Sequence, residues 1–391
     1  MRPTLDTLAD ALADRRLDGY LLDAAGDSAD QLYLSGFDAP DPFVTLYTPE
    51  EIALLVSSME FGRASEESHA DAVRRWADYD YRARAAEHGR QTARNAVIAD
   101  FLDEFDVESV GVPERFPVWT ADGLRDREIA VEPDPEGLVG DVRAVKDARE
   151  VEHIRAAQRA NEAAMQAAQE LLAAADVEDG VLHHAGDPLT SERVKEEIET
   201  TLLRHGCSLD ETIVACGAHA ADPHDRGSGP LDAGETIVVD IFPRDKETKY
   251  HADMTRTFVK GEPTAAARAF YDATEEAQAA ALDAIEAGVT GEEVHAAVCD
   301  VYEDAGYETL RTDEAAETGF IHSTGHGVGL EVHEGPRLAD GGEELEAGHV
   351  VTVEPGLYDP DVGGVRIEDL VVVTEDGHEN LTDYPRQFEL P

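Results

Sequence analysis

Cysteine is scarce in this sequence, and long apolar runs are absent from it. The 391 residues include three cysteines, and no pair of them has the CxxC spacing of a zinc or redox site: Cys207, Cys216 and Cys299. A small, odd number of cysteines indicates free thiols in a reducing compartment. No apolar run of about eighteen residues occurs, so we expect no membrane span and no membrane partner. The opening "MRPTLDTLADALADRR" has acids among its apolar residues, unlike a signal peptide, which predicts a cytoplasmic protein.

Lysine is the scarcest charged residue. The chain has 32 lysines and arginines together against 85 acids, which gives a net charge of −53. Charge of one sign repels itself and destabilises the compact state unless salt screens it. Because the acids are spread along the whole chain, they favour a surface adapted to concentrated salt, as in a halophile, over an acidic surface that binds basic partners such as histones. Nucleic-acid binding is not expected, because it requires a basic surface.

The length and the apolar pattern predict two domains and an α+β fold class. Residues 1–142 form an α/β domain, and residues 143–391 form the second. In the first domain, "GYLLDA", "QLYLSGF", "FVTLYTP" and "IALLVSS" are expected to be strands, and residues 4–14 and 83–105 to be helices. The boundary is predicted within "VEPDPEGLVGDVRAVKD", which is rich in proline and glycine.

Four helices are predicted in the second domain. The first is rich in alanine and covers residues 148–175, and the second covers residues 192–205 and is closed by Gly206. The third begins at Thr264, after a proline. The fourth begins at "TGEE", where Thr290 and Glu293 have the spacing of a capping box. Strand-like runs lie between and after these helices.

Two of these runs contain aspartates at positions where an unpaired charge would be costly. Asp240 ends the β-branched run "TIVVDIF", and Asp253 lies in "YHADMTRTF", thirteen residues later. The intervening "PRDKETK" is typical of a turn. If the runs form a hairpin centred between Lys246 and Glu247, the two carboxylates lie side by side.

The same pattern occurs a second time with glutamates. Glu354 lies in "VVTVEPG" and Glu368 in "VRIEDLVVV", fourteen residues on, with the midpoint at Asp361 in a segment dense in turn formers. Two such hairpins would concentrate four carboxylates. Four carboxylates cannot all ionise close together without cations between them.

A histidine-rich stretch completes the candidate site. "IHSTGHGVGLEVHE" (residues 321–334) contains three histidines, and His326 lies between Gly325 and Gly327, where the backbone can approach another segment closely. Four carboxylates and one imidazole suit a pair of divalent cations. The oxygen-rich donors favour manganese or cobalt over a structural zinc, and zinc or iron remains an alternative.

Five segments together carry a family resemblance. "IVVDIF", "ADMTRTF", "STGHGVGLEVHE", "VEPGLY" and "VRIED" resemble, in chain order, the signature segments of the pita-bread metallopeptidases, most of all the Xaa-Pro branch of prolidase and aminopeptidase P. The resemblance covers residues from about 150 to 391 and extends more loosely to the first domain through "QLYLSGF". It implies an α/β creatinase-like N-terminal domain followed by a pita-bread α/β catalytic domain.

The resemblance also implies a role for each site residue. The metal-ligand positions are held by Asp240, Asp253, His326, Glu354 and Glu368. Asp253 and Glu368 would bridge two ions that share a hydroxide. Glu354 would also take up and deliver the proton. The remaining candidates are catalytic or substrate-binding: His322, His333 and Arg366 for the oxyanion, His224 on the substrate side, and Arg337 for the carboxylate of a dipeptide.

The resemblance further implies a small peptide substrate and a homodimer. The family's two aspartates commonly lie closer together than the thirteen residues found here, and this longer turn leaves the substrate open. Two alternatives on the same fold are a metal-free creatinase-like amidinohydrolase and a non-enzymatic acidic interaction protein. No role is assigned to the other histidines without a motif: His183, His184, His349 and His378.

Overall fold

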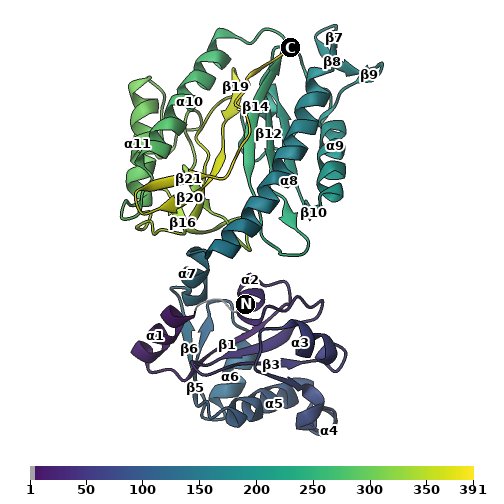
Figure 1. Ribbon diagram of the computed structural model, residues 1–391, viewed down its shortest axis with the longest axis vertical. Coiled ribbons are helices and arrows are strands. Elements are labelled where there is room, and N and C mark those ends of the chain that lie inside the picture. The colour runs from purple at the N-terminus through teal and green to yellow at the C-terminus, as the bar shows by residue number, and fades with distance from the viewer. Residues whose placement is uncertain (1–4) are drawn as a thin grey trace. The chain divides into compact units, whose positions relative to one another are not determined.

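The computed structural model describes residues 5–391 (Figure 1). The chain divides into two compact units, and the division falls between Arg143 and Ala144. Among residues 5–391, no helix is both long and apolar enough to cross a bilayer.

The first unit is built on a six-stranded sheet with the order β4-β3-β2-β1-β5-β6. Its strand β2 is antiparallel to β1 and β3, and the other neighbours are parallel. The strands are β1 (Gly19–Ala24), β2 (Phe43–Tyr47), β3 (Ile52–Val56), β4 (Ala72–Arg75), β5 (Ser109–Pro113) and β6 (Ala130–Asp134). The helices are α1 (Asp6–Arg15), α2 (Ala29–Ser35), α3 (Phe61–Glu67), α4 (Tyr81–His88), α5 (Arg90–Glu104), α6 (Val118–Arg125) and α7 (Leu138–Ala144), which ends at the division.

Two predictions for this unit were wrong in detail. "QLYLSGF" was expected to be a strand, but residues 29–35 form helix α2, which ends at Gly36 with a φ of 63°. A short apolar run does not distinguish a strand from a buried helix. Gln31 can be buried in this helix since its amide nitrogen donates to the carbonyl of Phe43. The single helix expected over residues 83–105 is two helices, because Gly89 adopts a φ of 85° between them. The start expected at Thr4 lies outside the described residues.

The second unit contains two larger sheets. They have the orders β11-β12-β14-β22 and β16-β15-β17-β20-β21, and β18-β19 forms a separate ribbon. The strands are β7 (Asp176–Glu178), β8 (Val181–His184), β9 (Asp187–Pro188), β10 (Cys207–Ser208), β11 (Thr212–Cys216), β12 (Ile237–Ile241), β13 (Arg244–Asp245), β14 (Met254–Lys260), β15 (Gly325–Gly327), β16 (Glu334–Leu338), β17 (Val350–Val353), β18 (Gly356–Asp359), β19 (Gly363–Arg366), β20 (Asp369–Thr374), β21 (Gly377–Asn380) and β22 (Glu389–Leu390).

Four long helices cover these sheets, as the sequence predicted: α8 (Ala148–Ala173), α9 (Ser191–Arg204), α10 (Ala265–Ala284) and α11 (Gly291–Asp304). The predicted capping box of Thr290 and Glu293 is present at the start of α11, and Thr264 caps α10. Apolar residues of α8 and α9 pack on β11, β12 and β14, while α10 and α11 pack on β17, β19 and β20. Burial of these apolar faces is the main force that holds the layers together.

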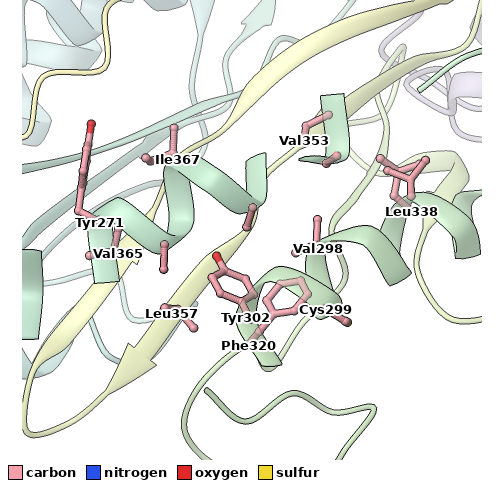
Figure 2. Close-up of a cluster of buried hydrophobic side chains, with 14 of the residues drawn as sticks. Tyr271, Val298, Cys299, Tyr302, Phe320, Leu338, Val353, Leu357, Val365 and Ile367 are labelled. Atoms are coloured by element: carbon pink, nitrogen blue, oxygen red, sulfur yellow. The ribbon is translucent and has the colours of Figure 1, made fainter. Parts of the chain in front are cut away.

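The core under α10 and α11 includes Phe320, which directly precedes the histidine-rich stretch (Figure 2). The fully buried Tyr302 on α11 contacts Phe320, with ring centroids 5.2 Å apart. Phe320 in turn contacts the ring of His322, also at 5.2 Å. The packed core therefore determines where this histidine lies.

Candidate active site

The two aspartates lie on a hairpin whose pairing differs from the prediction. β12 and β14 are antiparallel as expected, but Asp240 pairs with Thr255 and not with Asp253, which directly precedes β14. The turn closes off-centre because the carboxylate of Asp245 accepts bonds from the backbone within it and Lys249 adopts a φ of 69°. The pairing is thereby shifted by two residues from the symmetric hairpin. Asp253 is a diagonal neighbour of Asp240 instead of a direct one.

The two glutamates follow the predicted register. Glu354 lies between β17 and β18, and Glu368 between β19 and β20. Both strand pairs are antiparallel with the same register, because Val353 pairs with Asp369 and Gly356 pairs with Arg366. This register puts the two glutamates opposite each other and confirms the predicted hairpin.

His326 lies on β15 beside these acids. A Cβ atom on Gly325 would come within 2.0 Å of the carbonyl oxygen of Thr352, and one on Gly327 equally close to that of Gly335, so both flanking positions require glycine. The Nε2 atom of His326 lies 3.3 Å from Glu354 and 3.9 Å from Asp253.

Three of these side chains have the geometry of a metal site. Asp253, His326 and Glu368 each offer a ligand atom, and the three atoms lie within 4.8 Å of one another. The Nδ1 atom of His326 lies 3.1 Å from the carbonyl oxygen of Gly327, to which it can donate. This arrangement leaves Nε2 free as a ligand, which is the usual arrangement for a metal-binding histidine.

Burial and mutual repulsion make the ionised form of these carboxyls unfavourable. Burial raises the pKa values of Asp253 and Glu368 well above their usual range, and the neighbouring carboxylates raise them further. Burial also raises the pKa of Glu354 from 4.5 to about 7. One carboxylate oxygen of Asp240 and one of Asp253 are buried without a hydrogen-bond partner. Such oxygens are expected of metal ligands, so these residues fit divalent cations.

Arg366 ties one of these acids to a tyrosine and a second histidine. Its guanidinium donates to Asp240 at 2.7 Å and to the hydroxyl oxygen of Tyr358 at 2.9 Å. Nδ1 of His322 lies 2.7 Å from the carbonyl oxygen of Ser323 and therefore carries the proton. Nε2 of His322 then accepts from the Tyr358 hydroxyl at 3.0 Å. Burial raises the pKa of Tyr358 to about 12, so it stays protonated and can donate.

Sequence reasoning did not assign a role to Tyr358. The residue ends the "VEPGLY" segment, so the motif was the only signal for it. Its contacts depend on the pairing of β18 with β19, which brings it to Arg366.

All ten predicted site residues line one cavity of about 1190 Å³ in the second unit. His333 lies against His326, with ring centroids 4.3 Å apart, and burial lowers the pKa of His333, which favours its neutral form. Within residues 5–391, the side chain of Arg337 has neither an ion-pair nor a hydrogen-bond partner. The cavity therefore contains a cation that is available to a ligand.

Other lining residues were not singled out as site residues. Among them are Glu211 and Arg226, which form an ion pair at the cavity, and Phe242, which follows Asp240. The four histidines without an assigned role do not line this cavity.

Comparison with known proteins gives the family. Residues 152–375 match the model of metallopeptidase family M24, and residues 5–127 match that of the creatinase/prolidase N-terminal domain. The chain is a member of metallopeptidase family M24. This M24 peptidase is 28% identical over 362 residues to a Xaa-Pro dipeptidase of Pyrococcus horikoshii, and the match covers 91% of each chain.

Solved structures extend the likeness over nearly the whole M24 peptidase. It is similar to the Xaa-Pro dipeptidase from Bacillus anthracis, with a TM-score of 0.81, 26% identity and 98% of each chain covered. It is also similar to the X-Pro aminopeptidase from Thermotoga maritima, with a TM-score of 0.77, 27% identity, and 96% and 99% of the two chains covered. The predicted fold class, a creatinase-like domain followed by a pita-bread catalytic domain, is confirmed, as is the prediction of a metallopeptidase.

Proposed function

We propose that this M24 peptidase removes the amino-terminal residue from Xaa-Pro peptides with two divalent metal ions. The observation that carries the proposal is the convergence of four carboxylates and one imidazole in a cavity, with two carboxylate oxygens left without hydrogen bonds. The similarity to a Xaa-Pro dipeptidase and an X-Pro aminopeptidase supports the substrate class.

Each metal ligand has a proposed place. Asp253 and Glu368 would bridge the ions, Asp240 would hold one of them, and His326 and Glu354 the other. The oxygen-rich donors favour manganese or cobalt, with zinc or iron as the alternatives. Bound ions of this kind lower the pKa of water and polarise the scissile carbonyl.

The chain's own groups would move the protons and stabilise charge. Glu354 would take a proton from the attacking water and deliver it to the proline nitrogen, which must be protonated to leave. His333 makes no hydrogen bond to residues 5–391. Its neutral ring still has one N–H group, so it is the candidate donor to the oxyanion. His322 has both ring nitrogens engaged, so its part in oxyanion stabilisation, with that of Arg366, would pass through Tyr358.

The substrate's carboxylate has a candidate partner in Arg337. Its guanidinium lines the cavity without an acidic partner among the described residues, and a guanidinium binds a carboxylate through paired hydrogen bonds. His224 lines the same cavity and is proposed to contact substrate. A fixed cation for a terminal carboxylate favours dipeptides over longer peptides.

The test is release of the amino-terminal residue from an Xaa-Pro dipeptide and an Xaa-Pro-Xaa tripeptide. The chelator-treated protein is assayed in concentrated potassium chloride, with and without manganese or cobalt. Metal-dependent cleavage of the dipeptide alone supports a dipeptidase, and cleavage of the tripeptide supports an aminopeptidase. If metal binds but neither peptide is cleaved, the substrate proposal is wrong. If no metal binds, the dinuclear mechanism is wrong.

We also propose a homodimer in the cytoplasm of a salt-adapted cell, with residues 1–142 and 143–391 as its two domains. The charge of −53 supports the salt adaptation. Light scattering in concentrated potassium chloride tests the dimer, and a monomer there would refute it.

A further inference from the structure

The two glutamates of the candidate metal centre lie where the chain passes from one sheet to another. Glu354 falls between β17 and β18, and Glu368 between β19 and β20, so neither belongs to a strand ladder. Glu368 is 2% exposed. A buried carbonyl that no ladder satisfies needs another donor, and such a donor also determines where the backbone lies.

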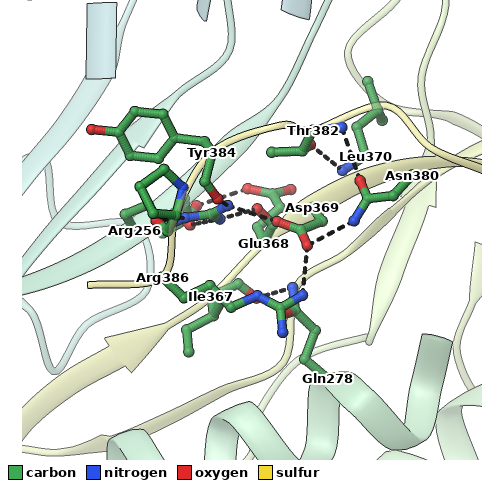
Figure 3. A network of polar contacts seen from close by, with 12 residues as sticks. Arg256, Gln278, Ile367, Glu368, Asp369, Leu370, Asn380, Thr382, Tyr384 and Arg386 are labelled. Atoms are coloured by element: carbon green, nitrogen blue, oxygen red, sulfur yellow. Dashed lines mark hydrogen bonds and ion pairs between the residues drawn. The ribbon is translucent and has the colours of Figure 1, made fainter. Parts of the chain in front are cut away.

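Arg256 supplies that donor for Glu368. Its side chain is fully buried, and its NH1 group donates to the carbonyl of Glu368 at 2.6 Å and to that of Thr255 at 3.0 Å (Figure 3). The other N–H groups donate to the carboxylate of Asp369 at 2.8 Å and to the carbonyls of Tyr384 and Pro385. All five donors of the guanidinium are thus used, which fixes its plane.

Gln278 does the same for the residues that precede the glutamates. It is fully buried on α10, and its amide nitrogen donates to the carbonyl of Val353 at 3.1 Å and to that of Ile367 at 3.2 Å. Val353 precedes Glu354, and Ile367 precedes Glu368. One side chain therefore links the two backbone segments that carry the carboxylates.

We propose that Arg256 and Gln278 are positioning residues that set the metal affinity of the site, an inference that rests on the proposed metal centre. Neither side chain lines the cavity, so neither contacts substrate or ions. They hold the backbone at and next to Glu354 and Glu368, and this fixes the separation of the two carboxylates. Loss of groups that orient metal ligands typically weakens metal binding by about tenfold to a hundredfold.

The experiment compares two variants with two matched controls. Arg256→Lys keeps the charge but loses the planar fork, and its control is Arg386→Gln, which removes a bond to the other oxygen of Asp369. Gln278→Met keeps the volume but removes both donors. Its control is Gln158→Met, since Gln158 is equally buried, also has an unpartnered Oε1, and donates only to the Thr382 hydroxyl.

Manganese binding to each chelator-treated protein is measured by calorimetry in concentrated potassium chloride, together with the free energy of unfolding. We expect binding about tenfold to a hundredfold weaker in Arg256→Lys and Gln278→Met. Both controls should keep the wild-type affinity even where they unfold more easily. Turnover by the two variants should recover at saturating manganese, because their ligands and catalytic groups are unchanged.

Wild-type affinity in a folded Arg256→Lys or Gln278→Met protein would overturn the inference. Equal weakening in Gln158→Met would also overturn it, because general loss of core packing would then be the cause. If Arg256→Lys does not fold, the comparison of Gln278→Met with Gln158→Met decides. If the wild-type protein itself binds no manganese or cobalt, it is the proposed function that fails.

Discussion

Replacing Glu354 with glutamine should stabilise the metal-free protein at neutral pH. The Glu354 carboxylate is only 17% exposed and lies among Asp240, Asp253 and Glu368. Burial removes water from the ionised carboxylate, and this cost outweighs the favourable charge of Arg366, so the pKa of Glu354 is raised to about 7. Glutamine has nearly the same shape and cannot ionise, so it removes this cost and little else.

The magnitude follows from the pKa difference between the folded and unfolded states. A carboxyl with a raised pKa in the folded state binds its proton more tightly there, so its contribution to stability is present below pH 4.5 and is lost as the pH rises towards 7. A rise from 4.5 to about 7 corresponds to about 3 kcal/mol, because each pKa unit is worth about 1.4 kcal/mol. The metal-free wild type should therefore lose about 3 kcal/mol relative to Glu354→Gln between pH 4.5 and pH 8.

Urea unfolding of both proteins measures this difference. The experiment uses chelator and constant high potassium chloride at several pH values, so that the charges elsewhere in the chain contribute equally to both proteins. Adding manganese should reverse the order, because metal stabilises the wild type more than the variant. A stability difference that does not change with pH would refute the reasoning, and so would a wild type that gains on Glu354→Gln as the pH rises.

Three other outcomes are expected. Arg337→Ala should raise the KM for an Xaa-Pro dipeptide by about tenfold to a hundredfold, which is the value of a charge-assisted hydrogen bond. The KM for the corresponding dipeptide amide, which has no carboxylate, should not change, and equal effects on both substrates would exclude a carboxylate contact. Tyr358→Phe should lower kcat by about tenfold or more, because Arg366 and His322 lose their shared hydroxyl, and it should destabilise the fold by about 1–3 kcal/mol, because both lost hydrogen bonds are buried or partly buried. Full activity in the folded variant would mean that this contact has no part in catalysis. Potassium chloride should raise the midpoint of thermal unfolding steeply, since it screens the charge of −53; a flat salt dependence would contradict the salt adaptation.

The sequence predicted the glutamate hairpin because its turn is symmetric about Asp361. No residue in that turn forces an offset, so the midpoint gave the register of Glu354 and Glu368. The aspartate hairpin could not be predicted in this way. The bonds to Asp245 and the left-handed Lys249 shift its pairing, and local preferences of this kind do not appear in a residue count.

Residues whose roles depend on long-range contacts were not predictable from pattern. Arg256 on β14 and Gln278 on α10 are buried polar residues, and a buried polar residue signals only that it must find partners. Their partners lie more than 70 residues away, so the sequence does not identify them. The helix α2 was missed for a related reason, because five of its seven residues are buried and so its sequence lacks the polar face that distinguishes a surface helix from a strand.

The division of the acids between two hairpins has a consequence for the order of folding. Each hairpin joins residues close in sequence, so each can form early and rapidly. Docking them against each other brings Asp253, Glu354 and Glu368 together, and their mutual repulsion opposes that step at neutral pH. Docking is therefore expected to be the late and slow event in the metal-free chain. Divalent cations would then act on the rate of maturation as well as on chemistry, by neutralising the surfaces that have to meet.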